Sequence, residues 1–512
     1  MGLFFNSHTN QLLLLLTVLA ALTFVTSRAR RYFIRREFAR RHGCQEPPTV
    51  NKDPFLALDQ IWTSVRYFRE YVSLEKNAER YRLYGDTYAW KLLLGHYRVF
   101  TMEPENVKSV LSTSFKDWGL GHRLPHFEPL LGKGIFDTDG EHWATSRALI
   151  RPSFTRDQVA DLAMFEELIP DLFARIPRDG VTVVDLQDLF FRYTIDSATA
   201  FLFGQSVASL KMDQSELGFA QAFNYSQEAI TLRFVLGPLG RIFPHKKADK
   251  CYRLCRDFAA RFVDEAVQAA QSEGADGTSE TKHERYIFSH ELARRTSDKR
   301  RILDELLDEL MNVLLAGRDT TAGLLSNMFF MLAKHPEVWD KLRQEVATLE
   351  GRLPSYEELR NLKYLRCCMN ESLRLHPVVP VNGRIALRDT VLPKGGGKDG
   401  RSPVFMPEGS TIEYNVYAMH RRKDIYGADA DVFRPERWEN GQLQPRWEYL
   451  PFNGGPRICL GQQYALTEAG YVTVRMAQEF RTLKSQDPGP WEEALTLTLC
   501  SRNGTKVSVT PA

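Results

Sequence analysis

The sequence predicts a mainly α-helical protein with small β-sheets, in which one large domain follows an N-terminal membrane anchor. Helical periodicity runs through most of the chain, as in "LLDELMNVLLAG" and "EVWDKLRQEVATLE". Strand-like runs are few, and no strand-helix alternation points to a doubly wound sheet. With 512 residues, of which 43% are hydrophobic, the chain is long enough to bury a large core. We therefore expect an anchor and basic segment over residues 1–45 and a folded domain over residues 46–512.

The anchor is predicted by an apolar run, "LLLLLTVLAALTFV", from Leu12 to Val25, which the residues before it extend toward membrane length. Seven arginines follow it: Arg28, Arg30, Arg31, Arg35, Arg36, Arg40 and Arg41. A cleaved signal peptide places its positive charge before the apolar run, whereas a retained anchor keeps the charged side in the cytosol. The order favours a retained anchor with the domain in the cytosol; the alternative is a cleaved signal with a small-residue site at Val25 to Ser27.

Within the domain, five short runs are expected as strands: "TYAWKLLL", "HYRVFTM", "RIALRDTVLP", "STIEYNVY" and "TKVSVTP". The polar stretch from Gln271 to Glu284 is expected as an exposed loop between helices. No internal repeat divides the domain.

Composition excludes several classes of function. A net charge of +3 and a pI near 8.3 are too mild for a nucleic-acid-binding protein. The seven cysteines are odd in number and include no C-x-x-C pair, which argues against both a disulfide framework and a zinc site. A reducing compartment fits this usage best.

One cysteine stands in an unusual setting, because "FNGGPRICLG" places Cys459 between Gly455 and Gly461, with Phe452 and Arg457 just before it. A thiolate that ligates haem iron needs backbone N–H groups near the sulfur, and glycines let the backbone approach. Arg457 can neutralise a haem propionate, and Phe452 can shield the sulfur from water. The helix expected after Cys459 adds a positive end. These residues together predict that Cys459 is the iron ligand.

With this loop the chain resembles the cytochrome P450 superfamily, and further motifs follow in that family's order. "NESLRLHP" contains the E-x-x-R pair Glu371 and Arg374, and "FRPERW" supplies Arg437 as a third member. An i, i+3 ion pair alone is a weak indication. The resemblance implies that the three residues lock the chain ahead of the cysteine loop. It also implies that Trp143 and Arg147 in "HWATSRALIRPSF", and Arg384 in "VNGRIAL", contact the haem propionates.

The stretch "LLAGRDTTAG" places Asp319 beside Thr320 in an apolar helix, where an unpaired acid is costly and threonine competes for helix carbonyls. The resemblance implies a local bend there, with Thr320 as hydrogen-bond partner of dioxygen and Asp319 as a proton relay. Some animal relatives carry a glutamate, esterified to haem, where this chain has Ala316. We therefore expect non-covalent haem b.

Over nearly the whole domain the chain is similar to fungal membrane-bound hydroxylases of alkanes and fatty acids, most specifically in "VNGR" and "FNGGPRICLGQQ". This resemblance implies hydroxylation at or near the end of a long aliphatic chain. Two departures, Trp118 and the charged segment "DTVLPKGGGKDGRSPVFMPEG", leave open a monooxygenase of a fungal pathway that oxidises a terpenoid or polyketide. A haem-thiolate rearranging enzyme is disfavoured because such enzymes usually lack the Asp319–Thr320 pair, and a non-catalytic haem protein is disfavoured because the oxygen-activating set is intact.

Selective oxidation of a terminal methyl group requires a narrow apolar channel, because the neighbouring methylenes have weaker C–H bonds. The residues expected around its end are Leu315, Ala316, Val378, Val379, Val381 and Leu499. By resemblance the partners are NADPH-cytochrome P450 reductase, the lipid bilayer, a hydrophobic small molecule and O2. The membrane expected for the anchor is the endoplasmic reticulum.

Overall fold

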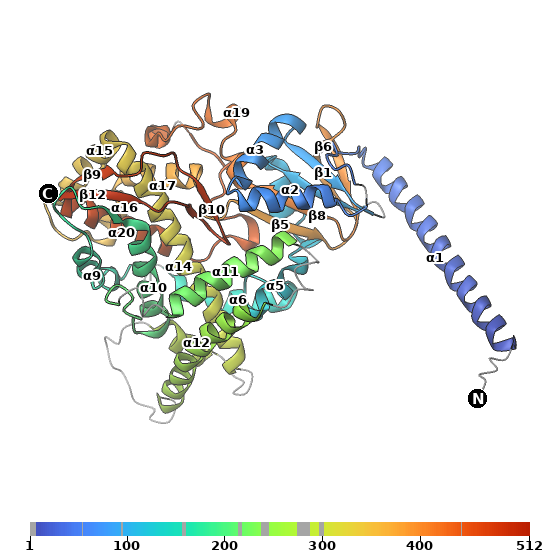
Figure 1. Cartoon of the computed structure of the whole chain (residues 1–512), viewed down its shortest axis with the longest axis horizontal. Coiled ribbons are helices and arrows are strands. Elements are labelled where there is room, and N and C mark those ends of the chain that lie inside the picture. The colour runs from blue at the N-terminus through green and yellow to red at the C-terminus, as the bar shows by residue number, and fades with distance from the viewer. Residues whose placement is uncertain are drawn as a thin grey trace.

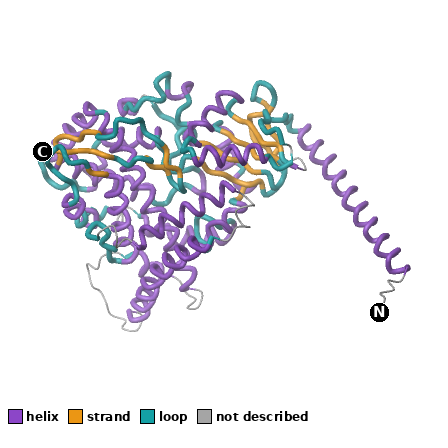
Figure 2. The backbone as a smooth tube through the Cα atoms, in the orientation of Figure 1, coloured by secondary structure: helices purple, strands orange, loops and turns teal. Residues whose placement is uncertain are grey.

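Helix α14, Ile302–Lys334, runs through the middle of the molecule, and the other long helices pack around it (Figure 1). The structure is a computed structural model that describes residues 7–53, 55–93, 96–155, 160–212, 218–236, 245–273, 287–295, 302–441 and 443–512. Helices dominate, and strands gather at two sides of the helical body (Figure 2). The prediction of a mainly helical fold with small sheets is confirmed.

The described helices fall into a longer and a shorter group. The longer ones are α1 Ser7–Arg41, α2 Leu58–Arg69, α3 Ser73–Tyr84, α5 Leu124–Leu131, α6 Gly140–Ile150, α10 Leu186–Phe203, α11 Gly218–Leu236, α12 Lys246–Glu273, α13 Phe288–Arg295, α15 Pro336–Val346, α17 Lys363–Leu375 and α20 Gln462–Glu479. The shorter ones are α4 Pro104–Lys108, α8 Ala163–Glu166, α9 Ile169–Ala174, α16 Tyr356–Asn361, α18 Val416–Met419 and α19 Lys423–Tyr426.

The largest sheet has the strand order β1-β2-β8-β5-β3, with β2 and β8 parallel and the other neighbours antiparallel. Its strands are β1 Thr87–Lys91, β2 Tyr97–Thr101, β3 Trp118–Gly119, β5 Val381–Ala386 and β8 Thr411–Asn415. A second sheet has the order β4-β12-β9, from Val184–Asp185, Lys506–Pro511 and Phe480–Ser485. Two hairpins complete the set: β6 Thr390–Gly396 with β7 Ser402–Met406, and β10 Glu493–Leu495 with β11 Leu499–Ser501.

All five runs expected as strands contain strands, at β1, β2, β5 with β6, β8 and β12. Strands β3, β4, β7, β9, β10 and β11 were not predicted, because most are too short for alternation to show. The first residues of the loop expected from Gln271 belong to helix, since α12 continues to Glu273; the remainder of that expectation lies outside the described residues.

Helix α1 projects from the body beside the hairpin β6–β7 (Figure 1). Its segment from Leu12 to Arg41 is apolar and long enough to cross a membrane, and none of its most apolar window is buried in the protein. Near its C-terminal end the helix is attached to the body: the guanidinium of Arg35 makes two contacts with the carboxylate of Asp389, at 3.0 and 2.9 Å. The Phe38 ring also packs against the ring of Phe405 in β7, with centroids 5.6 Å apart.

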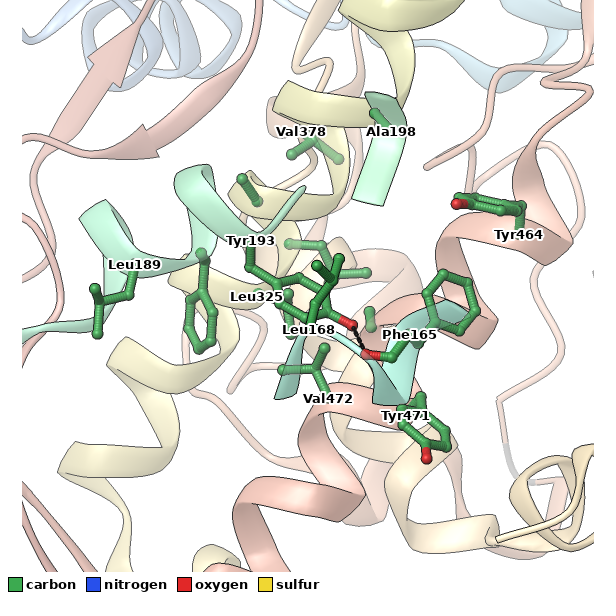
Figure 3. Packing of buried hydrophobic residues seen from close by; sticks show 14 of the residues in the cluster. Phe165, Leu168, Leu189, Tyr193, Ala198, Leu325, Val378, Tyr464, Tyr471 and Val472 are labelled. Atoms are coloured by element: carbon green, nitrogen blue, oxygen red, sulfur yellow. Dashed lines mark hydrogen bonds between the residues drawn. The ribbon is translucent and has the colours of Figure 1, made fainter. Parts of the chain in front are cut away.

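The core lies where α10, α14 and α20 meet (Figure 3). Tyr193 of α10 is fully buried there, and its hydroxyl donates a hydrogen bond to the carbonyl oxygen of Phe165, 3.0 Å away. Leu325 of α14 and Val472 of α20 are also fully buried in this core. Because an apolar side chain gains roughly 1.5–3 kcal/mol on full burial, this packing fixes the position of α14.

Candidate active site

The loop before α20 holds Cys459 in a defined place. The Cys459 N–H donates a hydrogen bond to the Phe452 carbonyl oxygen, 3.0 Å away, and this bond closes the loop between Phe452 and Cys459. Gly455 has φ +66°, and a Cβ on it would lie 1.9 Å from the Leu111 carbonyl oxygen. Glycine is therefore required at Gly455, for a contact with Leu111 that differs from the approach to the sulfur expected from the sequence. At Gly461 a Cβ would meet only Phe154, at 3.6 Å, so protein packing does not explain that glycine.

Cys459 lines a cavity of about 1120 Å³ between its own loop, α6 and the turn after α6. The side chain is exposed at this cavity, yet the protein around it desolvates the thiol and raises its pKa. The N–H of Gly461, and then the charge of Arg147, act in the opposite direction and lower the pKa. The site thus provides the N–H donor and the positive charge that a thiolate needs.

Two predicted residues of α6 and one of the cysteine loop meet beside this cavity. The Arg457 guanidinium lies over the Trp143 ring, 4.3 Å from its centroid, and donates to Asp139 Oδ1 at 2.7 Å. Arg147 donates to the carbonyl oxygen of Ile458, 3.1 Å away. The structure brings Trp143, Arg147 and Arg457 together with Cys459.

Arg384 of β5 approaches the same region with a partner that the sequence did not reveal. Asn382 Oδ1 accepts hydrogen bonds from Arg384 Nη1 at 3.1 Å and from Arg123 Nη2 at 2.6 Å. Arg123 lies at the start of α5, and its Nη1 donates to the Phe136 carbonyl oxygen. No motif singles out Arg123, because its position depends on contacts 259 residues apart in sequence.

These guanidiniums repel one another. Burial, and next the charge of Arg384, lower the pKa of Arg123 to about 10. Burial also lowers the pKa of Arg457 to about 10, although Asp139 raises it. Asp137, another nearby acid, has a pKa raised to about 7 by burial and so neutralises only part of the charge at neutral pH. A ligand with two carboxylates would relieve this repulsion.

The loop between α5 and α6 is held by polar side chains of α14. Asp308 Oδ2 accepts from the Lys133 N–H at 2.7 Å, and Asn312 Oδ1 accepts from the Phe136 N–H at 3.1 Å. At Gly132, with φ +68°, a Cβ would lie 1.7 Å from Asp308 Oδ1. Helix α14 therefore positions the loop that carries the carbonyl partner of Arg123.

The structure brings the E-x-x-R residues together. Arg374 Nε and Nη2 donate to the two carboxylate oxygens of Glu371, each at 2.8 Å, and neither side chain is exposed. Arg437 Nε donates to Glu371 Oε1 at 3.3 Å, and Trp438 Nε1 donates to Glu371 Oε2 at 2.9 Å. Arg374 also donates to backbone carbonyls at His420 and Ala430, which joins α17 to the segment before the cysteine loop.

Helix α14 has one open face. Of residues 306–330, all are buried except Ala316, Gly317 and Thr320, which lie one turn apart and are half-buried. Thr320 Oγ1 donates to the Ala316 carbonyl oxygen at 2.6 Å, so the expected competition for a helix carbonyl is present while the helix continues unbroken. Asp319, the neighbouring predicted residue, is not on this open face: it is 1% exposed, and its Oδ1 accepts a hydrogen bond from Arg318 Nη1 at 2.8 Å.

A second buried acid near this stretch was not predicted. Glu468 of α20 is 1% exposed, and burial raises its pKa to about 8, although the hydroxyls of Ser197 and Thr321 lower it. Thr321 follows Thr320 on α14. Glu468 lies nine residues after Cys459, but nothing in the sequence indicated its contact with Thr321, because the packing of α20 on α14 creates that contact.

The residues expected at the end of the substrate channel fall into different environments. Val378 and Leu499 are buried, and a Cβ at Gly323 of α14 would lie 2.6 Å from Val378 Cγ1. Leu315 is also buried, at 8% exposed, and Ala316 lies on the open face of α14. Val381 is half-buried at the start of β5, and Val379 is exposed, at 37%. Trp118, in strand β3 of the largest sheet, is 4% exposed and packs in the core formed on that sheet.

The residues present fit a haem. Cys459, with an N–H donor and a guanidinium near its sulfur, faces a cavity. The guanidiniums near this cavity outnumber the acids that could neutralise them, which suits the two propionates of haem. Fold and site together define a haem-thiolate oxidoreductase.

Comparison with known proteins identifies the family. The cytochrome P450 family model matches residues 63–508. Cytochrome P450 monooxygenase himC of Aspergillus japonicus is 51% identical over 91% of this chain and 83% of its own. Cytochrome P450 monooxygenase fsdH of Fusarium heterosporum is 46% identical over 96% and 88%. Cytochrome P450 52A12 of Debaryomyces hansenii is 42% identical over 91% and 92%.

The chain belongs to the cytochrome P450 family. It is a monooxygenase, an oxidoreductase whose cofactor is haem b ligated by a cysteine thiolate.

Proposed function

We propose that the protein hydroxylates a long-chain alkane or fatty acid at or near the chain end, with Cys459 as the iron ligand. The observation that carries the proposal is the open face of α14 at Ala316, Gly317 and Thr320, within a stretch that is otherwise buried. Bound haem would supply the activation of O2 with electrons from NADPH, and this face offers a part of the helix that the protein leaves uncovered, together with the Thr320 hydroxyl.

Cys459 is favoured over the adjacent pair Cys367 and Cys368 by its surroundings. Cys367 and Cys368 are buried in α17, where desolvation raises the pKa of Cys367 to about 11 and that of Cys368 well above its usual range. Neither lines the cavity beside α6. Cys459 has the access, the Gly461 N–H and the Arg147 charge that Cys367 and Cys368 lack.

The propionates of haem would be held by the guanidinium cluster and the indole beside it. We assign this role to Arg384, Arg457, Arg147 and Trp143, and add Arg123. Glu371, Arg374 and Arg437 would hold the segment ahead of the cysteine loop. This division separates residues that bind the cofactor from residues that fix the backbone around it.

Thr320 and Asp319 would handle protons on the open face of α14. Thr320 can exchange its bond to the Ala316 carbonyl for one to a ligand. Asp319 is a buried acid whose pKa is raised by burial, which suits a group that takes up and releases a proton. Ala316 offers no carboxylate for an ester, which supports non-covalent haem.

A chain-end preference is supported by the close packing after the open face, where Val378 and Leu499 approach Gly323. The competing candidate is a bulkier terpenoid or polyketide. Trp118, one of the two departures that raised this candidate, is buried in β3 of the largest sheet, and the other, around β6–β7, contacts α1. Neither position adds support for a larger substrate.

We further propose that residues 1–45 anchor the catalytic domain, residues 46–512, on the cytosolic face of the endoplasmic reticulum. Besides α1, exposed apolar side chains on and just before α2 support contact with a bilayer: Phe55, Leu56, Leu58 and Trp62. NADPH-cytochrome P450 reductase would dock on the cysteine side, where exposed Arg151 lines the cavity.

The test uses the full chain in membranes with reductase and NADPH, on long-chain alkanes, fatty acids and polycyclic lipids. We expect mainly the terminal alcohol, and a shift toward inner carbons in Val378→Ala. Val338→Ala, a buried valine of α15, is the matched control. Turnover of polycyclic lipids alone would refute the chain-end proposal, and a long-wavelength band in the reduced carbon monoxide complex of Cys459→Ala would refute the ligand assignment.

A further inference from the structure

Arg318, the residue before Asp319, has a buried side chain, 2% exposed, that contacts residues of three helices. Its Nη1 donates to Asp319 Oδ1 at 2.8 Å and to Asn224 Oδ1 of α11 at 2.8 Å. Its guanidinium lies 5.0 Å from the ring centroid of Phe191 in α10 and 5.5 Å from that of Phe223 in α11. A buried arginine in this arrangement holds one orientation.

Asp319 depends on this arginine. Its Oδ1 is bonded to Arg318, whereas its buried Oδ2 has no hydrogen-bond partner among the described residues. Burial raises the pKa of Asp319, and the charge of Arg318, followed by the nearby side-chain amide of Gln227 in α11, lowers it. The Gln227 amide is near enough to act on the carboxyl group but does not meet the geometry of a hydrogen bond to Oδ2. The other titratable groups facing the pair are the thiols of Cys500 in β11 and Cys255 in α12. Arg318 is therefore the one cation set against the Asp319 carboxylate among these groups.

We propose that Arg318 is a positioning residue: it holds Oδ1 of Asp319, leaves Oδ2 as the oxygen that takes up and releases a proton, and is itself placed by Asn224 of α11. The inference rests on the proposed relay role of Asp319. Its consequence is that the position of α11 and the proton chemistry of α14 are linked through one nitrogen, Arg318 Nη1. A shift of α11 changes how strongly Asp319 is paired.

The first experiment follows the infrared band of a protonated carboxyl group during a pH titration of resting enzyme, without turnover. Asp319→Asn identifies the band. Arg318→Met should let the band persist to a pH higher by about one unit or more, since a buried acid without its cation keeps its proton. Arg318→Lys should restore most of the shift. An unchanged titration in Arg318→Met would overturn the proposal.

The second experiment tests the link to α11 and covers the case in which Arg318→Met does not fold. Asn224→Ala keeps both charged residues, and Ser226→Ala is its control, because the Ser226 hydroxyl donates to Ala222 within α11. We expect Asn224→Ala to shift the band in the same direction by a smaller amount and to divert more NADPH into hydrogen peroxide. Identical behaviour of the two variants would overturn the link.

These outcomes are separable from failure of the proposed function. Wild-type protein that oxidised no lipid while its Asp319 band still responded to Arg318→Met would refute the substrate proposal alone. Wild-type protein that hydroxylated lipids while its Asp319 band ignored Arg318 would refute the positioning role alone.

Discussion

Gly455 and Leu111 touch so closely that a Cβ on the glycine would lie 1.9 Å from the leucine carbonyl oxygen. The contact joins the cysteine loop to the π-helical turn Ser109–Thr113. Because both partners at this point are backbone, neither can yield by changing a rotamer. The position of Cys459 thus depends on an element more than 300 residues earlier in the chain.

Gly455→Ala should displace the cysteine loop, lower haem content and reduce stability by about 1–3 kcal/mol, the range for a strained backbone position. Gly351→Ala is the matched control, since Gly351 has a similar φ of +76° but open space around it. The carbon monoxide difference spectrum and thermal unfolding measure both effects. Equal losses in the two variants would show that φ, not the Leu111 contact, is responsible.

Arg123→Gln should release haem faster, because one guanidinium of the cluster loses its charge while Asn382 keeps a partner in Arg384. Transfer of haem to apomyoglobin measures the rate, with about a tenfold increase for each 1.4 kcal/mol of lost binding. Arg352→Gln, at an exposed arginine paired with Glu358, should release haem at the wild-type rate. Unchanged haem release in Arg123→Gln would exclude a propionate role.

Glu468→Gln should change how stability depends on pH. The folded state raises the pKa of Glu468 to about 8, so the contribution of this group is fully present below its unfolded value of 4.5 and is lost as pH rises toward 8. Wild type should lose up to about 1.4 kcal/mol per pH unit relative to Glu468→Gln across that window. Thermal midpoints at several pH values, with exposed Glu70→Gln as control, provide the measurement.

Thr320→Ala should keep haem and substrate binding and divert reducing power into hydrogen peroxide, because the hydroxyl on the open face of α14 is lost. Thr320→Ser keeps a hydroxyl and should retain most of the coupling of NADPH to product. Parallel assays of NADPH, peroxide and alcohol measure the effect. Wild-type coupling in Thr320→Ala would remove the residue from the relay.

The sequence was most informative where function constrains a short segment. The loop from Phe452 to Gly461 and the pair Glu371–Arg374 could be recognised because each is a pattern within one short segment; the contacts of the loop with Leu111, Asp139 and Trp143 could not. The strands found by alternation and the apolar length of α14 were predictable for the same local reason.

Contacts between distant segments were not predictable. Arg123 reaches Asn382, and Arg318 reaches Asn224, only because folding brings α5 to β5 and α11 to α14. Glu468 likewise meets Thr321 through helix packing. Val378 and Leu499 were recognised as apolar, but their closure against Gly323 depends on a missing Cβ on another element.

The attachment of α1 through Arg35 and Asp389 has a mechanical consequence. A domain joined to a terminal helix by a flexible linker can rotate freely relative to it, whereas the Arg35–Asp389 ion pair and the Phe38–Phe405 ring contact fix α1 in one orientation relative to the domain. If α1 lies in a bilayer, a change in its tilt would change the orientation of the whole domain, because the two are held together at Arg35 and Phe38. Bilayer thickness, which sets helix tilt, would then also set the orientation of the domain.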